Sequence, residues 1–379
     1  MKKEILLTPG PSQVPPQVAA AGAVPIIHHR TKEFMEVFGR LIEGMKKVYG
    51  TQGDAFILGS SGTGAMETCV VNALSPGDRV VIGITGKFGE RFSLMCKAWG
   101  VEVVELVREW GHIVTPEELT ETLSKEKDIK AVFITHSETS TGIMHPIDKL
   151  GPIVDEYGAL FIVDSVSALG GLEMRMDDWK VDMVASGSQK ALMLPPGLSF
   201  VGVRGEKAWK AIEASKIPKF YFDLKKYKKS IMKSGDTPFT IPVSLCLSLD
   251  ESLKMILGEG LESVYARHKK MSAATQAGIK ALGLKLFSDH LSYVESVFTV
   301  PEGIDGGKLV KVMTDKYGAR VSGGQEPYKG KIVRIAHMGY VTHHDVLLAM
   351  TSLEMALSEM GFKVELGAGT KAAEEVFLS

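Results

Sequence analysis

The chain has 379 residues, with 44 Lys and Arg against 45 Asp and Glu, a formal net charge of −1 and three cysteines. This balance lacks the positive field of a sequence-independent nucleic-acid binder, and no block of like charge forms an interaction tail. The cysteines are too few and too scattered for a disulfide framework, and none forms a CxxC pair with zinc spacing, so we expect a reducing compartment and no metal site.

The amino terminus does not have the pattern of a signal peptide, because only three apolar residues, Ile5, Leu6 and Leu7, precede Thr8. No run of ~18 apolar residues predicts a membrane helix. We therefore expect a cytoplasmic chain with no membrane or nucleic-acid partner. At ~150 residues per domain its length suits about two or three domains.

From about residue 55 the chain alternates short β-branched runs with longer amphipathic stretches. The runs are 55–58, 79–82, 101–104, 131–134, 160–163, 183–185 and 199–203. Helical candidates between them are 65–73, 116–124 and 147–157. Several runs are apolar almost throughout, which is typical of strands buried on both faces of a sheet. The pattern predicts an α/β fold with a mostly parallel sheet flanked by helices.

The regular alternation of strand and helix candidates ends after Val203. A lysine-rich stretch at 225–233 is read as a solvated face or loop, with an interface or active-site rim as the alternative. A long helical segment at 243–257 then leads to a smaller unit with strand candidates at 294–300 and 332–335. We expect an N-terminal arm over 1–20, a large domain over 21–257 and a small C-terminal domain over 258–379.

A glycine-rich segment, 59–67, follows a predicted strand and opens a predicted helix. Its glycines let a ligand approach the backbone, and the N–H groups of a helix start bind phosphate. A dinucleotide fingerprint is disfavoured, because Glu67 occupies the third glycine position and no acid ends the next strand. The alternative to phosphate binding is a turn that only packs tightly.

Two further segments follow buried strands. Asp164 lies at the carboxyl end of one, where ligands bind in open α/β sheets, although a helix cap or turn is the alternative. Lys190 lies among small and apolar residues after the next strand; it is either a surface charge or an amine nucleophile toward a carbonyl. A phosphate cradle, an acid and a lysine in this order are what pyridoxal phosphate requires.

The chain resembles the class V pyridoxal-phosphate aminotransferases of fold type I, within them the alanine–glyoxylate / serine–pyruvate aminotransferase family. The likeness runs nearly end to end, through 7–12, 135–142, 163–166, 186–191, 195–197 and 333–335. The resemblance implies a large domain with a mostly parallel seven-stranded sheet, a smaller C-terminal α/β domain, pyridoxal 5′-phosphate as cofactor and a homodimer with its active sites at the subunit interface.

The resemblance also assigns roles residue by residue. Lys190 matches the catalytic lysine, which holds the cofactor aldehyde and then shuttles a proton as general base and acid. Asp164 matches the partner of the pyridine nitrogen, with Val166 in the same cofactor-binding segment. Arg334 matches the arginine that binds the substrate α-carboxylate, and Gly10 falls in the substrate-binding segment of the arm.

The phosphate turn of the family matches Thr63, Gly64 and Ala65, and Gln189 matches a further phosphate contact. The family often has His at Ala65, so only the backbone N–H is expected to contribute there. Phe88 falls where an aromatic ring stacks on the cofactor, although alone it would be read as a core residue.

Three other places are read from the same resemblance. Thr139 matches a hydroxyl near the phenolic oxygen of the cofactor. Thr240 matches a residue that reaches the phosphate of the neighbouring subunit, whereas Thr237 stands where some relatives have a Tyr with the same role. The segment 28–30, His-His-Arg, is either at the substrate entrance or on a loop.

The leading functional prediction is a ping-pong transaminase that moves an amino group from alanine or serine to glyoxylate or pyruvate. A lyase or desulfurase on the same fold is the first alternative, disfavoured because no cysteine follows Cys246 and Gln189 replaces the His usual before the lysine. A non-catalytic accessory subunit that keeps the fold is the second.

Overall fold

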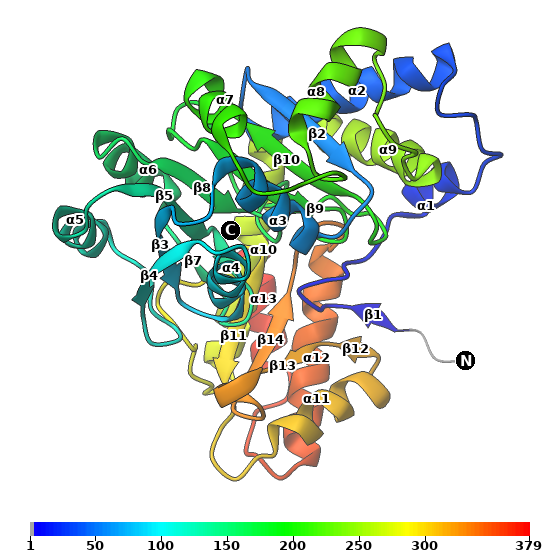
Figure 1. The fold of residues 1–379 in the computed structure, drawn as a ribbon. Coiled ribbons are helices and arrows are strands. Elements are labelled where there is room, and N and C mark those ends of the chain that lie inside the picture. The colour runs from blue at the N-terminus through cyan, green and yellow to red at the C-terminus, as the bar shows by residue number, and fades with distance from the viewer. Residues whose placement is uncertain (1–3) are drawn as a thin grey trace.

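A computed structural model describes residues 4–379, so the first three residues of the predicted arm lie outside the described part. Its centre is a seven-stranded sheet in the order β2-β10-β9-β8-β5-β3-β4 (Figure 1). The strands are β2 (Asp54–Leu58), β3 (Arg79–Ile84), β4 (Glu102–Val107), β5 (Ile129–Thr135), β8 (Leu160–Asp164), β9 (Met183–Gly187) and β10 (Ser199–Val203). Only β10 runs antiparallel to its neighbours, which confirms the predicted mostly parallel sheet.

Helices cover both faces of this sheet. One face packs against α1 (Pro16–Gly22), α2 (Lys32–Tyr49), α5 (Pro116–Lys125), α6 (Ile147–Glu156) and α9 (Val243–Glu259). The other packs against α3 (Gly62–Ala73), α4 (Lys87–Ala98), α7 (Gly205–Ala214) and α8 (Leu224–Ser234). Successive strand residues point to opposite faces, so Val163 joins the first core and Ile162 the second.

Two sequence expectations are refined by this packing. The run at 101–104 belongs to β4, an edge strand whose residues are exposed or only partly buried, unlike β8 and β9, which are buried throughout. The lysine-rich stretch is helix α8 rather than a loop. Its Leu224 and Tyr227 are buried while Lys225 and Lys229 are exposed, so the lysines do form a solvated face.

The C-terminal part of the chain builds a second, smaller α/β unit, drawn in yellow to red in Figure 1. Its antiparallel sheet has the order β11-β14-β13. The elements are α10 (Leu261–Ala281), β11 (Glu295–Thr299), α11 (Gly306–Asp315), β12 (Ala319–Arg320), β13 (Ser322–Gly323), η1 (Glu326–Tyr328), β14 (Ile332–Ala336), α12 (His343–Glu359) and α13 (Ala368–Leu378). None of the helices in the described part combines the length and apolarity needed to cross a bilayer.

Two short pairings connect the parts of the fold. Strand β1 (Ile5–Leu6) runs parallel to β12, which ties the N-terminal arm to the C-terminal unit (Figure 1). The hairpin of β6 (Ser137–Glu138) and β7 (Ile143–Met144) follows β5 and reaches the C-terminal unit, where the amide of Ser292 donates to the Gly142 carbonyl at 2.7 Å. The carboxyl ends of β8 and β9 therefore face the arm, the hairpin and the small sheet.

Candidate active site

Lys190 lies in the turn after β9 and is only 9% exposed. Burial lowers the pKa of its amine to about 8, although nearby Glu295 and Asp164 favour the charged form. The ammonium donates to the Pro9 carbonyl. Gly10 has φ +123°, and a Cβ there would lie 2.6 Å from Lys190 Nζ, so the arm can approach the lysine this closely only through glycine.

Ser12 fastens the arm to the lysine turn. Its hydroxyl donates to the Lys190 carbonyl at 2.6 Å, and its amide donates to the Gln189 carbonyl at 3.0 Å. The sequence reading quoted this serine only as part of the 7–12 motif and assigned it no role. The structure makes the arm a part of the site wall, which agrees with the placement of Gly10 there.

Asp164, the last residue of β8, is 3% exposed. One carboxylate oxygen, Oδ1, accepts the Val166 amide at 2.8 Å, which gives Val166 a concrete role in orienting the acid. Burial raises the pKa of Asp164 to about 6, and Glu138 adds to the rise, whereas the Val166 amide and Lys190 oppose it. A cationic partner, such as a protonated ring nitrogen, would stabilise the ionised form of this buried acid.

The glycine-rich turn lies directly against Asp164's segment. A Cβ on Gly62 would lie 2.8 Å from the Val166 methyls, and one on Gly187 would lie 3.2 Å from the Gly62 backbone. Helix α3 begins after Ser61, whose side chain accepts the Gly64 amide at 3.4 Å. The start of α3 therefore meets the end of β9 backbone to backbone, and it meets the turn after β8 through the Val166 side chain.

The free amides at this helix start overlap only in part with the predicted phosphate turn, because Thr63 is among them and Ala65 is not. The Ala65 amide donates to the Ser61 carbonyl at 3.1 Å, so it is part of the helix ladder. The amides of Gly62 and Thr63, the first two helical positions, have no carbonyl one turn back and are the ones open to an anion. The Thr63 hydroxyl accepts from Arg91 at 3.1 Å, which brings a cation to the same turn.

The surroundings of the Gln189 side chain indicate whether a phosphorylated cofactor fits the site. Its Oε1 is buried without a hydrogen-bond partner in the described part of the chain, and it lies 3.3 Å from where a Gly187 Cβ would be. The Gln189 side chain therefore lies against the start of α3, and its Oε1 accepts no hydrogen bond from the described part of the chain. Together with the side-chain-free approach at Gly62 and the buried Lys190, this arrangement fits the expected pyridoxal phosphate.

Phe88 and Thr139 flank the site from α4 and the hairpin. The Phe88 ring is partly buried and lies 4.8 Å from the Arg91 guanidinium, so it is not a core residue. Its amide donates to Glu138 Oε2 at 2.8 Å. Thr139 is 1% exposed, and its carbonyl accepts from Arg334, so its backbone has a role that the sequence did not suggest.

Arg334 reaches the site from β14 and is 6% exposed. Its Nε donates to the Gly323 carbonyl at 2.9 Å, and its Nη1 donates to the Thr139 carbonyl. Both acceptors are neutral, so these bonds orient the guanidinium without cancelling its charge. The remaining N–H groups suit a carboxylate, which a guanidinium binds in bidentate fashion.

The predicted residues of the subunit contact do not join this cluster. Thr240 is exposed, in a depression of about 350 Å³ that residues 26–29 and 240–244 line. The Thr237 hydroxyl donates to the Phe239 carbonyl at 2.6 Å. Arg30 forms an ion pair with Asp236 at 2.5 Å, which places the 28–30 segment beside Thr240 rather than beside Lys190.

Two buried acids were missed by the sequence reading. Glu138 accepts the amides of Phe88, Gly89 and Ser140 and is 0% exposed. Glu295, on β11, is also 0% exposed. Glu138 stands inside the 135–142 motif, which could have singled it out, whereas no local pattern marks Glu295.

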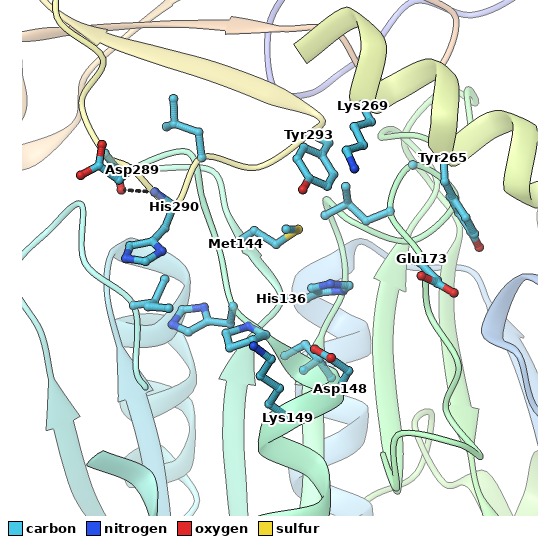
Figure 2. A pocket seen from close by; sticks show the side chains of 18 of the residues that line it. His136, Met144, Asp148, Lys149, Glu173, Tyr265, Lys269, Asp289, His290 and Tyr293 are labelled. Atoms are coloured by element: carbon cyan, nitrogen blue, oxygen red, sulfur yellow. Dashed lines mark hydrogen bonds between the residues drawn. The ribbon is translucent and has the colours of Figure 1, made fainter. Parts of the chain in front are cut away.

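A cleft of about 1360 Å³ lies at a different place. Figure 2 shows it lined by His136, Met144, Lys149, Lys269, Tyr293 and their neighbours, with acids and bases mixed. None of the predicted site residues lines it. His136 separates the two places, because its amide donates to the Asp164 carbonyl at 2.8 Å while its ring lines the cleft.

Comparison with known proteins identifies the family of the chain. The sequence profile of the family described as Aminotransferase class-V matches residues 6–348. The chain is 42% identical over 380 residues to the soluble hydrogenase 42 kDa subunit of Anabaena cylindrica, covering 99% of each chain. It is 36% identical over 381 residues to the serine–glyoxylate aminotransferase of Methylorubrum extorquens, covering 97% of this chain and 94% of the relative.

A solved structure has the same architecture. The ureidoglycine–glyoxylate aminotransferase of Bacillus subtilis superimposes with a TM-score of 0.94 at 31% identity, covering 100% of this chain and 99% of that one. The similarity therefore extends over both the large sheet and the C-terminal unit.

Proposed function

The chain belongs to the class-V aminotransferase family, and from that premise we propose that it moves an amino group from alanine or serine to glyoxylate or pyruvate in a ping-pong cycle. The observation that carries this proposal is the convergence of Lys190, Asp164 and Arg334 from three separate elements. All three are buried, and Arg334 is bonded only to neutral carbonyls in the described chain. The names of two relatives, which include glyoxylate, support the acceptor.

Pyridoxal phosphate is the cofactor of this family, and when bound it supplies an aldehyde that captures amines and a ring that withdraws electrons. Lys190 would hold that aldehyde, and Asp164 would keep the ring nitrogen protonated. The amides of Gly62 and Thr63, with Gln189, would hold the phosphate. Phe88 would cover the ring, and the Thr139 hydroxyl would lie near its phenolic oxygen.

Lys190 would also move the proton of the reaction. Because burial lowers its pKa to about 8, a useful fraction of the amine is neutral near neutral pH, as a general base requires. When Lys190 Nζ is released, it can donate a hydrogen bond to the Pro9 carbonyl and so stay next to the site. Arg334 would fix the substrate by its α-carboxylate, so that only one face of Cα is presented to Nζ.

We also propose a cytoplasmic homodimer. Ile26 is 72% exposed and Phe220 is 71% exposed, so each offers a large apolar side chain to a partner surface. Ile26 lines the same depression as Thr240, so a partner covering this surface would meet the predicted phosphate contact. Light scattering coupled to size exclusion would test it, with a monomer at micromolar concentration as the contrary result. The three cysteines are free and buried, as a reducing compartment allows.

A desulfurase is disfavoured by the state of the thiols. Cys69, Cys96 and Cys246 are all buried, and burial raises the pKa of the Cys96 and Cys246 thiols to about 12. Such thiols are poor nucleophiles. None of them belongs to the C-terminal unit that carries Arg334.

An accessory role is the second alternative, because the Anabaena cylindrica relative is named as a hydrogenase subunit. A subunit freed from catalysis would have no need of the buried lysine, acid and arginine, which this chain keeps together. Cofactor binding without turnover of any amino donor would favour this role.

The decisive experiment is a panel of donors against glyoxylate and pyruvate with the cofactor-loaded protein. Alanine, serine and aspartate would each be compared by kcat/KM. We expect alanine or serine to change the visible band of the cofactor and to yield the corresponding oxo acid. A fully loaded protein whose band no donor changes would contradict the proposal.

A further inference from the structure

Glu295 is a buried acid of the candidate site that the proposed reaction does not use. It is 0% exposed, and neither carboxylate oxygen has a hydrogen-bond partner within residues 4–379. A buried polar group without a partner costs free energy, far more so when it is charged. The other unexplained acid, Glu138, differs because three amides and a hydroxyl donate to it.

The sheet register places Glu295 beside Arg334. In the antiparallel pair β11–β14, Val297 is opposite Arg334, and opposite residues share a face. Glu295 is two residues from Val297 and so lies on that same face, as the diagonal neighbour of Arg334. The hairpin closes the face from above, because a Cβ on Gly142 would lie 2.2 Å from Val297 and 3.4 Å from Glu295 Oε1.

Three charged groups face this carboxyl from three other elements: Arg334 of β14, Lys190 of the turn after β9 and Glu138 of β6. Burial raises the pKa of Glu295 to about 8, against the opposing effect of Arg334 and Lys190 and with a small addition from Glu138. Glu295 therefore gains or loses its proton near pH 8, well above the range of an ordinary carboxyl group.

A substrate carboxylate at Arg334 would bring a second anion to one buried guanidinium. Like charges in a site of low dielectric constant cannot both stay ionised unless donors hold them. Glu138 has its donors, whereas Glu295 has none, so Glu295 is the acid that accepts the proton. Its neutral form has an O–H group that could donate to the incoming carboxylate.

We propose that Glu295 is a positioning residue that couples binding of the substrate carboxylate to uptake of one proton. At pH values above the pKa of Glu295, its carboxylate balances the charge of Arg334 while the site is empty. When the substrate arrives there, Glu295 takes a proton from solvent and leaves Arg334 to the substrate. The inference rests on the proposed function in one respect, namely that Arg334 binds the substrate carboxylate. It predicts that anionic substrates bind more weakly as pH rises.

The test uses the cofactor-loaded protein and propionate, which has the carboxylate but neither an amino nor an oxo group. Calorimetry in buffers of different ionisation enthalpy, from about pH 6 to about pH 10, counts the protons bound per propionate. We expect uptake to rise toward about one proton above the pKa of Glu295, and Kd to rise about tenfold per pH unit there. A flat Kd with no uptake would overturn the inference.

Variants assign the proton to its group. Glu295→Gln should abolish the uptake and make propionate binding tight and independent of pH, whereas Glu302→Gln, an exposed acid of the same unit, should leave both unchanged. The visible band of the cofactor, recorded in the same titration, reports any proton taken up at Lys190. Unchanged uptake in Glu295→Gln, or a proton wholly accounted for at Lys190, would contradict the proposal.

Two further measurements keep the inference testable if the amide variant does not fold. In the wild type at a pH above the pKa of Glu295, infrared difference spectra on addition of propionate should gain a carboxylic acid C=O band, and its absence at that pH would count against Glu295. Glu295→Asp, which keeps a titratable group, should keep the uptake. Because binding of propionate needs no turnover, a protein that shows this coupling but transaminates nothing would refute the proposed function and not the coupling.

Discussion

The two halves of the candidate site differ in how they are built. On the large sheet, Asp164 ends one buried strand and Lys190 follows another, and the α3 turn packs against Val166 and Gly187 beside them. On the small sheet, Arg334 and Glu295 meet only because β11 and β14 pair in one register. In the first half each residue takes its place from the end of its own strand, whereas in the second the pair exists only through the register of two strands.

The difference has an electrostatic counterpart. Asp164 and Glu138 accept backbone amides, so their charges are held by the fold itself. Arg334 is bonded only to carbonyls and Glu295 to nothing within the described chain. In the proposed function, the large sheet thus presents a pre-organised site for the cofactor, and the small sheet presents charges that a substrate carboxylate would complete.

The largest predicted effect removes the centre of the first half. Lys190→Ala should reduce the rate of the half-reaction with alanine by at least about 10³-fold, since both the aldehyde anchor and the general base are lost. Stopped-flow absorbance measures it, with Lys225→Ala, an exposed lysine of α8, as the matched control. Circular dichroism should show both variants folded. Substantial activity in Lys190→Ala would remove the lysine from the chemistry.

The next effect concerns the second half. Arg334→Gln loses a charge-assisted contact worth ~1.5–3 kcal/mol, so KM for glyoxylate should rise by about 10- to 100-fold while cofactor binding stays intact. Steady-state kinetics and a cofactor titration separate the two quantities. Arg320→Gln changes an exposed arginine of the same unit and is the control. Weakened cofactor binding with an unchanged KM would mean that the two halves are not separate in function.

Much of the first half could be predicted from sequence. A buried strand followed by an acid or a lysine is visible in a short window, and the resemblance supplied the roles. Thr63 was predicted, but the free amide of Gly62 and the engaged amide of Ala65 were not, because they depend on where α3 begins and on which carbonyl Ala65 reaches.

The second half was visible only in part. Arg334 came from the resemblance, but Glu295 lies in a strand of ordinary composition, and its meaning arises from the register that places it beside Arg334. The role of Ser12 likewise requires the arm to cross from the small sheet to the lysine turn. Contacts between elements far apart in sequence leave no local pattern to read.

Asp164 allows a smaller effect to be measured on the first half alone. Its pKa is raised in the folded chain, so between about pH 4 and about pH 6 the unfolded chain releases a proton that the folded chain keeps, and stability falls as pH rises. Asp164→Asn removes this dependence but keeps an oxygen for the Val166 amide. In cofactor-free protein, the free energy of unfolding of Asp164→Asn minus that of the wild type should rise by on the order of 2 kcal/mol across that window and then level off.

Urea unfolding at several pH values measures this difference. Asp315→Asn is a suitable control, since its carboxyl lies at the end of α11 in the other unit. An Asp164→Asn difference that is constant from about pH 4 to about pH 6 would show that the Asp164 carboxyl is already ionised at the lower pH.

The smallest effect tests the arm that joins the halves. Ser12→Ala leaves the buried Lys190 carbonyl without its hydroxyl donor, which should cost about 1 kcal/mol of stability and slow the half-reaction a few-fold by loosening the lysine turn. Thr8→Ala removes an exposed hydroxyl bond to the Pro11 carbonyl in the same arm and should change neither quantity measurably. Equal effects of the two variants would mean that the arm acts only by covering the site. A larger kinetic effect of Ser12→Ala would show that the small sheet positions Lys190 through the arm, which would make the lysine depend on both halves.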